Sequence, residues 1–149
     1  MQGSIVCGVD GSAGSEAALA GAAELAEGLG ARLVLAHVAD HVPAYTAVGP
    51  IAAVPRPAPM TASVHEARAR LLSEMAEAAG LEEAEQRVVS GIAAERLAEL
   101  ADEEAADMIV VGSRGRGSFK SALRGTVSSD LISIARCPVL VVPNRIHGP

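Results

Sequence analysis

Short apolar runs alternate with longer segments of helical periodicity along this chain, and the alternation limits the folds that it can adopt. Five runs are too short for helices and are rich in Val, Ile and Leu, which is typical of strands buried on both faces. Because a helix between neighbouring parallel strands makes a right-handed crossover, the pattern predicts an α/β fold with an open parallel sheet. We predict strands at 4–9, 31–38, 86–90, 107–111 and 137–142, and helices at 15–29, 62–79, 93–105 and about 127–135.

The 149 residues suffice for one domain, and we expect a single domain over residues 1–149. A doubly wound fold of this kind is expected to have five parallel strands in the order 3-2-1-4-5, with helices on both faces. The order reverses between strands 1 and 4, and ligands bind in the crevice outside the carboxyl ends of the strands at that point. The turns after 4–9 and 107–111 are therefore the first places to look for a site.

The segment 112–129 follows the fourth predicted strand and is rich in glycine and hydroxyl side chains. Gly112 and Gly115 are two residues apart, and nine more residues lead to Gly125 and Thr126. Glycine lets the backbone approach a ligand with its N–H groups exposed, and hydroxyls at a helix start add donors, which suits a phosphate. The alternative is a plain turn, but two such clusters would bracket a polyphosphate from two sides. The spacing matches neither the Walker-type loop nor the dinucleotide fingerprint.

The turn Asp10-Gly11-Ser12 ends the first predicted strand and would meet Gly112 across the crevice. Asp-Gly-Ser is also ordinary turn chemistry, so Asp10 could simply cap the next turn. His37 and His41 flank the end of the second predicted strand, where we expect a structural rather than a catalytic histidine.

These segments together resemble the universal stress protein family, specifically its ATP-binding branch. The series from Gly112 to Thr126 matches the nucleotide-binding signature of that branch at every signature position, and the first turn and the last two strands are also similar. The resemblance implies a Rossmann-like fold of the adenine nucleotide alpha-hydrolase type with ATP as cofactor. It covers nearly the whole chain, except residues 40–60.

The resemblance also implies which residues contact the nucleotide. Asp10 would contact the sugar or a Mg²⁺ ion bound by the phosphates, and the backbone near Val38 would contact adenine. The expected nucleotide-binding residues are Val9, Asp10, Gly11, Ser12, Val38, Gly112, Ser113, Arg114, Gly115, Arg116, Gly117, Gly125, Thr126, Val127 and Ser128. No catalytic residue is assigned, because the central motif contains neither a histidine nor a second carboxylate that could serve as a general base.

The expected function is that of a dimeric, ATP-binding regulatory protein with a protein partner that the sequence does not identify. In this family the last strand commonly pairs between two subunits, here through Val139, Leu140, Val141 and Val142, an apolar edge that would otherwise promote aggregation. Two alternatives stay open. One is a slow Mg²⁺-dependent ATP hydrolase that acts as a timer, and the other is a dimeric scaffold that binds no nucleotide.

Charge and composition narrow the classes of partner. Residues 112–145 contain six basic residues and one acid, whereas residues 1–111 contain six basic and seventeen acidic residues. An acidic chain with one local basic segment suits a small anionic ligand better than a nucleic acid. No segment approaches a membrane span and no leader is apparent, so we expect a cytoplasmic protein with reduced Cys7 and Cys137. The proline-rich segment 40–60 is predicted to be a mobile loop that acts as a lid, a partner surface or a linker.

Overall fold

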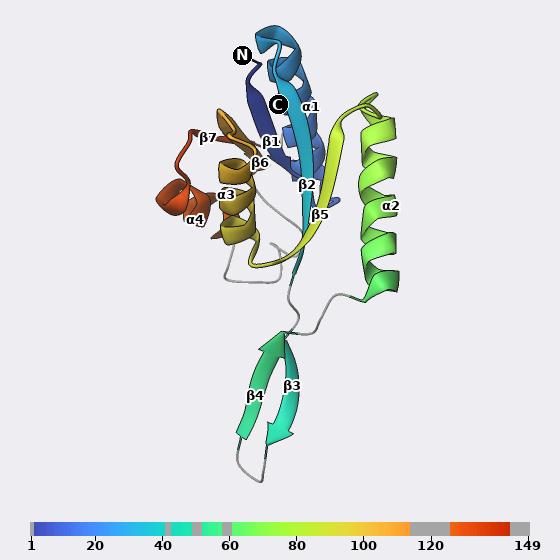
Figure 1. Cartoon of the computed structure of the whole chain (residues 1–149), viewed down its shortest axis with the longest axis vertical. Helices are drawn as coiled ribbons and strands as arrows, with labels where there is room; N and C mark the ends of the chain where they lie inside the picture. The colour runs from blue at the N-terminus through green and yellow to red at the C-terminus, as the bar shows by residue number, and fades with distance from the viewer. Residues whose placement is uncertain (1, 41–42, 49–51, 58–60, 114–125, 144–149) are drawn as a thin grey trace, which may run out of the picture.

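The computed structural model describes residues 2–40, 43–48, 52–57, 61–113 and 126–143 (Figure 1). Helices and strands alternate through most of this part of the chain, as the sequence predicts. Their order is β1 (Ser4–Gly8), α1 (Ala13–Leu29), β2 (Arg32–Asp40), β3 (Pro43–Val48), β4 (Ala52–Pro57), α2 (Ala62–Ala78), β5 (Glu85–Gly91), α3 (Ala93–Glu103), β6 (Met108–Gly112), α4 (Thr126–Ile134) and β7 (Val139–Val142).

The main sheet has five strands in the order β5-β2-β1-β6-β7, and every neighbouring pair is parallel. This confirms the order 3-2-1-4-5, since β5, β6 and β7 are the third, fourth and fifth predicted strands. Strand β1 lies in the centre and pairs with β2 through Cys7 and Leu35 and with β6 through Cys7 and Val110. The strand order therefore reverses between β1 and β6, so that the turns after these two strands start side by side.

Two apolar cores cover the two faces of the sheet. One core joins α1 and α2 to the sheet through residues such as Leu19, Leu72 and Leu35. The other joins α3 and α4 to the opposite face through residues such as Leu97 and Leu131. Because β1 contributes alternate residues to the two cores, both of its faces are buried, which explains its apolar run.

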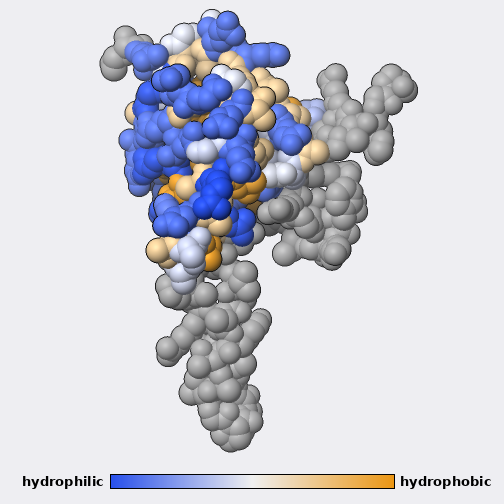
Figure 2. Space-filling model, turned by 90° about the vertical axis from the view of Figure 1, so that its right-hand side faces the viewer, coloured by the Kyte–Doolittle hydropathy of each residue, from blue (hydrophilic) through white to orange (hydrophobic). Residues whose placement is uncertain are grey.

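The inward face of α2 differs from the sequence prediction. The pattern favours an apolar side of Val64, Ala67, Leu71, Met75 and Ala78, but the fully buried residues of α2 are Leu72 and Ala76. The predicted outer side is correct, because the charged residues of that side are exposed, and Figure 2 shows a mainly hydrophilic surface on the side of the molecule that α2 forms. These exposed residues are Glu66, Arg70, Glu74 and Glu77.

The prediction of a loop over 40–60 is wrong for most of the segment. Strands β3 and β4 form an antiparallel two-stranded sheet, which extends away from the main sheet on the side where β2 ends (Figure 1). The three prolines of these strands, Pro43, Pro55 and Pro57, fall at every second pair of the register. In an antiparallel ladder, only every second residue pair exchanges N–H···O hydrogen bonds. Prolines that all lie at the other pairs therefore remove no hydrogen bond from the ladder. The expected mobility stays a prediction.

Candidate functional site

The turn after β1 is built around the carboxylate of Asp10. Its Oδ1 atom accepts hydrogen bonds from the backbone N–H of Ser12 at 2.9 Å and from the Ser12 hydroxyl at 2.5 Å. The oxygen of that hydroxyl in turn accepts from the N–H of Ser15 at 3.2 Å and so caps α1. Gly11 between them has φ +87°, a conformation that favours glycine. The capping role that the sequence left open for Asp10 is therefore present, and the carboxylate is held in place beside the positive end of the α1 dipole.

The end of β6 lies against the first turn of α1. A Cβ atom on Gly112 would come within 2.6 Å of the backbone C and O atoms of Gly14, closer than real Cβ atoms come. Gly112 is therefore required by this close approach of the backbone. The same contact brings the turn after β6 next to the turn after β1, although the two lie about a hundred positions apart in sequence. The sheet thus brings the two predicted turns together at its switch point.

The remaining predicted site residues divide between described and undescribed parts of the chain. Ser113 donates its backbone N–H to the carbonyl of Val142 at 2.9 Å, which extends the pairing of β6 with β7. Thr126, Val127 and Ser128 form the first turn of α4, with Val127 38% exposed. Five predicted contacts lie outside the described residues, and they are Arg114, Gly115, Arg116, Gly117 and Gly125.

Val9 and Val38 lie on the other side of the crevice. Val9 is buried directly after β1, and its N–H donates to the carbonyl of Ala36 at 2.8 Å. Val38 is half-buried near the end of β2 and pairs with Val89 of β5, so it is separated from Gly112 by the β1 strand. Two strand spacings amount to about 10 Å, a distance that an elongated ligand could span.

A histidine and an arginine lie beside this side of the crevice. The carbonyl of Val9 is 2.7 Å from Nδ1 of His37, and Nε2 of the same ring is 3.5 Å from Nη1 of Arg68 in α2. A carbonyl can only accept, so Nδ1 carries the hydrogen and Nε2 accepts from the guanidinium. His37 is only 3% exposed, so its ring is held within the interface between α2 and the sheet. The sequence analysis missed Arg68, although its place one turn before the buried Leu72 is a core-facing position and could have indicated it.

The described residues offer neither an activated thiol nor a preformed metal site. Burial raises the pKa of the Cys7 thiol to about 12, so this thiol stays protonated at neutral pH and is a poor nucleophile. Both cysteines are free, as expected. Within the described ranges, no three His, Cys, Asp or Glu side chains are grouped so that they could hold a metal ion. If Mg²⁺ binds at Asp10, the phosphates of a ligand would therefore have to supply further oxygens.

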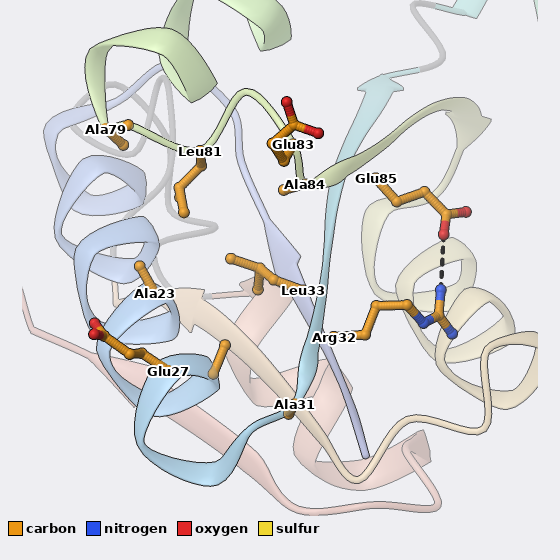
Figure 3. Close-up of a pocket in the computed structure, with 12 residues that line it drawn as sticks. Ala23, Glu27, Ala31, Arg32, Leu33, Ala79, Leu81, Glu83, Ala84 and Glu85 are labelled. Atoms are coloured by element: carbon orange, nitrogen blue, oxygen red, sulfur yellow. Dashed lines mark hydrogen bonds and ion pairs between the residues drawn. The ribbon is translucent and has the colours of Figure 1, made fainter. Parts of the chain in front are cut away.

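A groove of about 730 Å³ lies on the opposite side of the sheet, where the parallel strands begin. We call this side the amino-terminal edge, and the side where the strands end the carboxyl edge. The groove runs between the carboxyl ends of α1 and α2 and the starts of β2 and β5, and Figure 3 shows the ion pair of Arg32 and Glu85 at one side. The floor consists mainly of small apolar side chains such as Ala23, Ala26 and Leu33. None of the site residues predicted from the sequence lines this groove.

The charged residues at this amino-terminal edge neutralise one another. Glu104 pairs with Arg32 at 2.8 Å and with Arg87 at 3.0 Å, and its side chain is only 13% exposed. The hydrogen bond to Glu104 is the main reason why the pKa of Arg32 is raised. The sequence pattern of the predicted helix 93–105 predicts that the cluster Asp102-Glu103-Glu104 faces solvent. This prediction is wrong for Glu104, because its side chain bridges two strands that come from distant parts of the chain.

Comparisons with known proteins agree with this architecture. Residues 1–143 match the model of the universal stress protein family. A universal stress protein of Mycobacterium tuberculosis is 34% identical over 143 residues, covering 93% of this chain and 94% of that protein. A universal stress protein of Thermus aquaticus is 31% identical, covering 93% of this chain and 96% of the relative.

Solved structures of universal stress proteins have a similar fold. A universal stress protein in complex with cAMP is 27% identical with a TM-score of 0.64, covering 94% of this chain and 95% of that one. A member of the family from Burkholderia pseudomallei is 28% identical with a TM-score of 0.66, at 94% and 95% coverage.

The fold and the site define a doubly wound α/β protein with two polar turns at the switch point of its sheet. The chain belongs to the universal stress protein family. In the part of the chain that the structure describes, no helix is both long enough and apolar enough to cross a membrane. The cytoplasmic location stays a prediction from the sequence.

Proposed function

We propose that this protein binds an adenine nucleotide in the crevice between the turns after β1 and β6 and acts as a nucleotide-responsive regulatory protein. The observation that carries the proposal is the contact of Gly112 with Gly14, which brings the Asp10 turn and the start of the glycine-rich segment to one place. The start of α1 lies there too, and its dipole favours a negatively charged group.

The nucleotide that we propose is ATP, with Mg²⁺ carried by its phosphates. The glycine and hydroxyl pattern of segment 112–129 suits a polyphosphate, and the structural relative described above was solved in complex with cAMP. These observations support an adenine nucleotide as the ligand more strongly than they support three phosphates on it. Competition between ATP, AMP and cAMP for the purified protein would decide which of them is preferred.

Binding can be tested with a substitution in the glycine series. Gly115→Asp would place a carboxylate where we expect a phosphate, so steric bulk and charge repulsion should reduce ATP affinity at least a hundredfold. Isothermal titration calorimetry measures the affinity, and urea unfolding of the ligand-free protein measures stability. Unchanged affinity would contradict the proposal, and an unfolded variant would show that Gly115 is structural. In addition, adenine nucleotide released by denaturing the purified protein would show that the site is loaded in the cell.

We favour regulation over hydrolysis because the described residues at this edge show no side chain poised as a general base. Both ring nitrogens of His37 are engaged, and the Oδ1 atom of Asp10 closes the turn with Ser12. ATP binding would then change the affinity for a protein partner. The hydrolytic alternative predicts Mg²⁺-dependent phosphate release that disappears in Asp10→Ala while the fold survives.

We also propose that two copies associate through β7. Among the described strands, β7 is an outermost strand with β6 as its one neighbour, so its outer side can pair with a second copy. Leu140 in this strand is 37% exposed, and Ile132 and Ile134 of the preceding helix are 65% and 46% exposed. Light scattering after size-exclusion chromatography should give twice the chain mass, and Leu140→Arg should give a folded monomer. A monomeric wild-type protein at micromolar concentration would contradict this.

A further inference from the structure

Two polar residues occupy positions that the packing of the domain reserves for apolar side chains. On β2, the residues that face α1 and α2 are Leu33, Leu35 and then His37. On α2, the residue one turn before the buried Leu72 is Arg68. Breaks in an otherwise consistent apolar pattern are expected at functional or strained sites. These two breaks lie next to each other, because the side chains contact across the helix–sheet interface.

Arg68 holds a positive charge that the described structure does not neutralise. Its guanidinium contacts the imidazole of His37, and no ion pair within the described ranges includes it. By contrast, Arg32 and Arg87 both pair with Glu104. A half-buried guanidinium has lost part of its hydration, so it interacts more strongly with a ligand than an exposed arginine does.

The turn of α2 that carries Arg68 also lies against the candidate site. A Cβ atom on Gly11 would be 3.7 Å from Cδ2 of Leu71, which follows Arg68 by three residues on the same helix. On the other side, the hydrogen bond from His37 to the carbonyl of Val9 connects Arg68 to the backbone at the end of β1. Arg68 therefore lies at the border of the crevice, on the side of β1 and β2.

The position of Arg68 relative to the strands of the sheet indicates which part of a bound nucleotide it would contact. The glycine-rich segment starts after β6, while Arg68 is attached through His37 to β2, on the far side of β1. If the phosphates lie at the glycine-rich segment, the base and sugar extend toward β2. The whole chain contains one Phe, one Tyr and no Trp, so few aromatic side chains are available to stack on a base. A planar guanidinium can stack on a base in place of an aromatic ring.

We propose that Arg68 contacts the nucleobase of the bound nucleotide and that His37 positions its guanidinium for this contact. The inference rests on the proposed function, and it adds a base-contacting residue from α2, outside the nucleotide-binding residues expected from the sequence. His37 is a positioning residue, because it acts through Arg68.

The test compares three ligands with two substitutions at position 68. In Arg68→Gln, the affinities for adenosine, AMP and ATP should fall by the same factor, roughly tenfold, because all three share the base. Arg68→Lys keeps the charge but loses the planar group, so it should restore little of the affinity. Arg70→Gln on the exposed side of the same helix is the matched control and should bind like the wild type. Urea unfolding of each variant separates binding from stability.

The role of His37 has its own readout. His37→Phe keeps a ring of similar size but removes the acceptor for Arg68, so it should weaken all three ligands by a similar factor. In the double variant with Arg68→Gln, the losses should not add, because both substitutions remove one contact. Fully additive losses would contradict the positioning role.

The outcomes distinguish this inference from the proposed function. If the wild type binds no adenine compound, the proposed function fails and the inference fails with it. If the wild type binds and Gly115→Asp does not, while Arg68→Gln binds normally, the inference alone is wrong. A loss that grows with the number of phosphates, or full rescue by Arg68→Lys, would also overturn it, because Arg68 would then be a phosphate contact.

Discussion

The two edges of the central sheet use charged residues in opposite ways. At the amino-terminal edge, Arg32 and Arg87 are bridged by the largely buried Glu104, so that charges from distant segments cancel at the protein surface. At the carboxyl edge, Arg68 contacts the imidazole of His37 and Asp10 closes a tight turn. The ion pairs tie distant segments together, whereas Arg68, which has no ion pair within the described ranges, keeps a charge that a ligand could use. The groove at the amino-terminal edge has a volume of about 730 Å³, yet the ion pair beside it has the chemistry of a structural site.

The largest effect is expected where the backbones approach most closely. In Gly112→Ala, the new methyl group would overlap the backbone of Gly14, so the free energy of unfolding should fall by about 1–3 kcal/mol. Affinity for ATP should fall as well, because the two turns must move apart. Urea unfolding and calorimetry measure the two quantities.

Gly28 provides the matched control for Gly112. It lies inside α1, and an added Cβ would meet no atom within 4 Å. Gly28→Ala should therefore raise stability by about 0.5–1 kcal/mol, since glycine is a poor helix former, and should leave binding unchanged. If both glycines tolerate alanine equally, the close approach at the crevice is not tight.

Two aspartates allow the edges to be compared directly. At the amino-terminal edge, Oδ2 of Asp107 accepts from the N–H of Ser4 at 2.9 Å, and at the carboxyl edge Asp10 accepts from Ser12. Asp107→Ala and Asp10→Ala should each cost about 1–2 kcal/mol of stability, because a backbone donor loses its charged partner. Only Asp10→Ala should also reduce nucleotide affinity. If both variants bind the nucleotide equally well, the two edges do not differ in nucleotide binding.

The smallest effect is expected in the ion-pair cluster. Glu104→Gln keeps the size of the side chain but removes the charge shared by Arg32 and Arg87, so stability should fall by about 0.5–1 kcal/mol at low salt. The difference from the wild type should shrink as salt is added, and nucleotide binding should not change. Unfolding curves at two salt concentrations check this. Reduced nucleotide affinity in this variant would show that the two edges are coupled.

The sequence predicts the centre of the sheet well because β1, β2 and β6 are buried on both faces. An apolar run such as that of β6 predicts a buried strand and the crossover rule predicts parallel pairing, while the strand order comes from the doubly wound fold and the family resemblance. That order places β1 beside β6, and the structure shows the end of β6 packed against Gly14 in the first turn of α1. The glycine series beyond Ser113 stays a prediction.

The errors have physical causes. Prolines argued against strands in 40–60, but a two-stranded sheet can place them at pairs that need no donor. The apolar side of α2 was assigned incorrectly because Arg68 interrupts the inward stripe that contains Leu72 and Ala76. Glu104 was expected to face solvent because its arginine partners lie far away in sequence, and periodicity does not report such contacts.

The most direct test of the account is to find where the nucleotide binds. Backbone amide signals of isotope-labelled protein should be followed by NMR during titration with ATP. The account predicts the largest shifts at Asp10–Ser12 and at Gly112 and Ser113, with small changes around Leu81 and Glu85. If the largest shifts instead lie around Leu81 and Glu85, and the crevice does not respond, the nucleotide binds at the amino-terminal groove and the account is wrong.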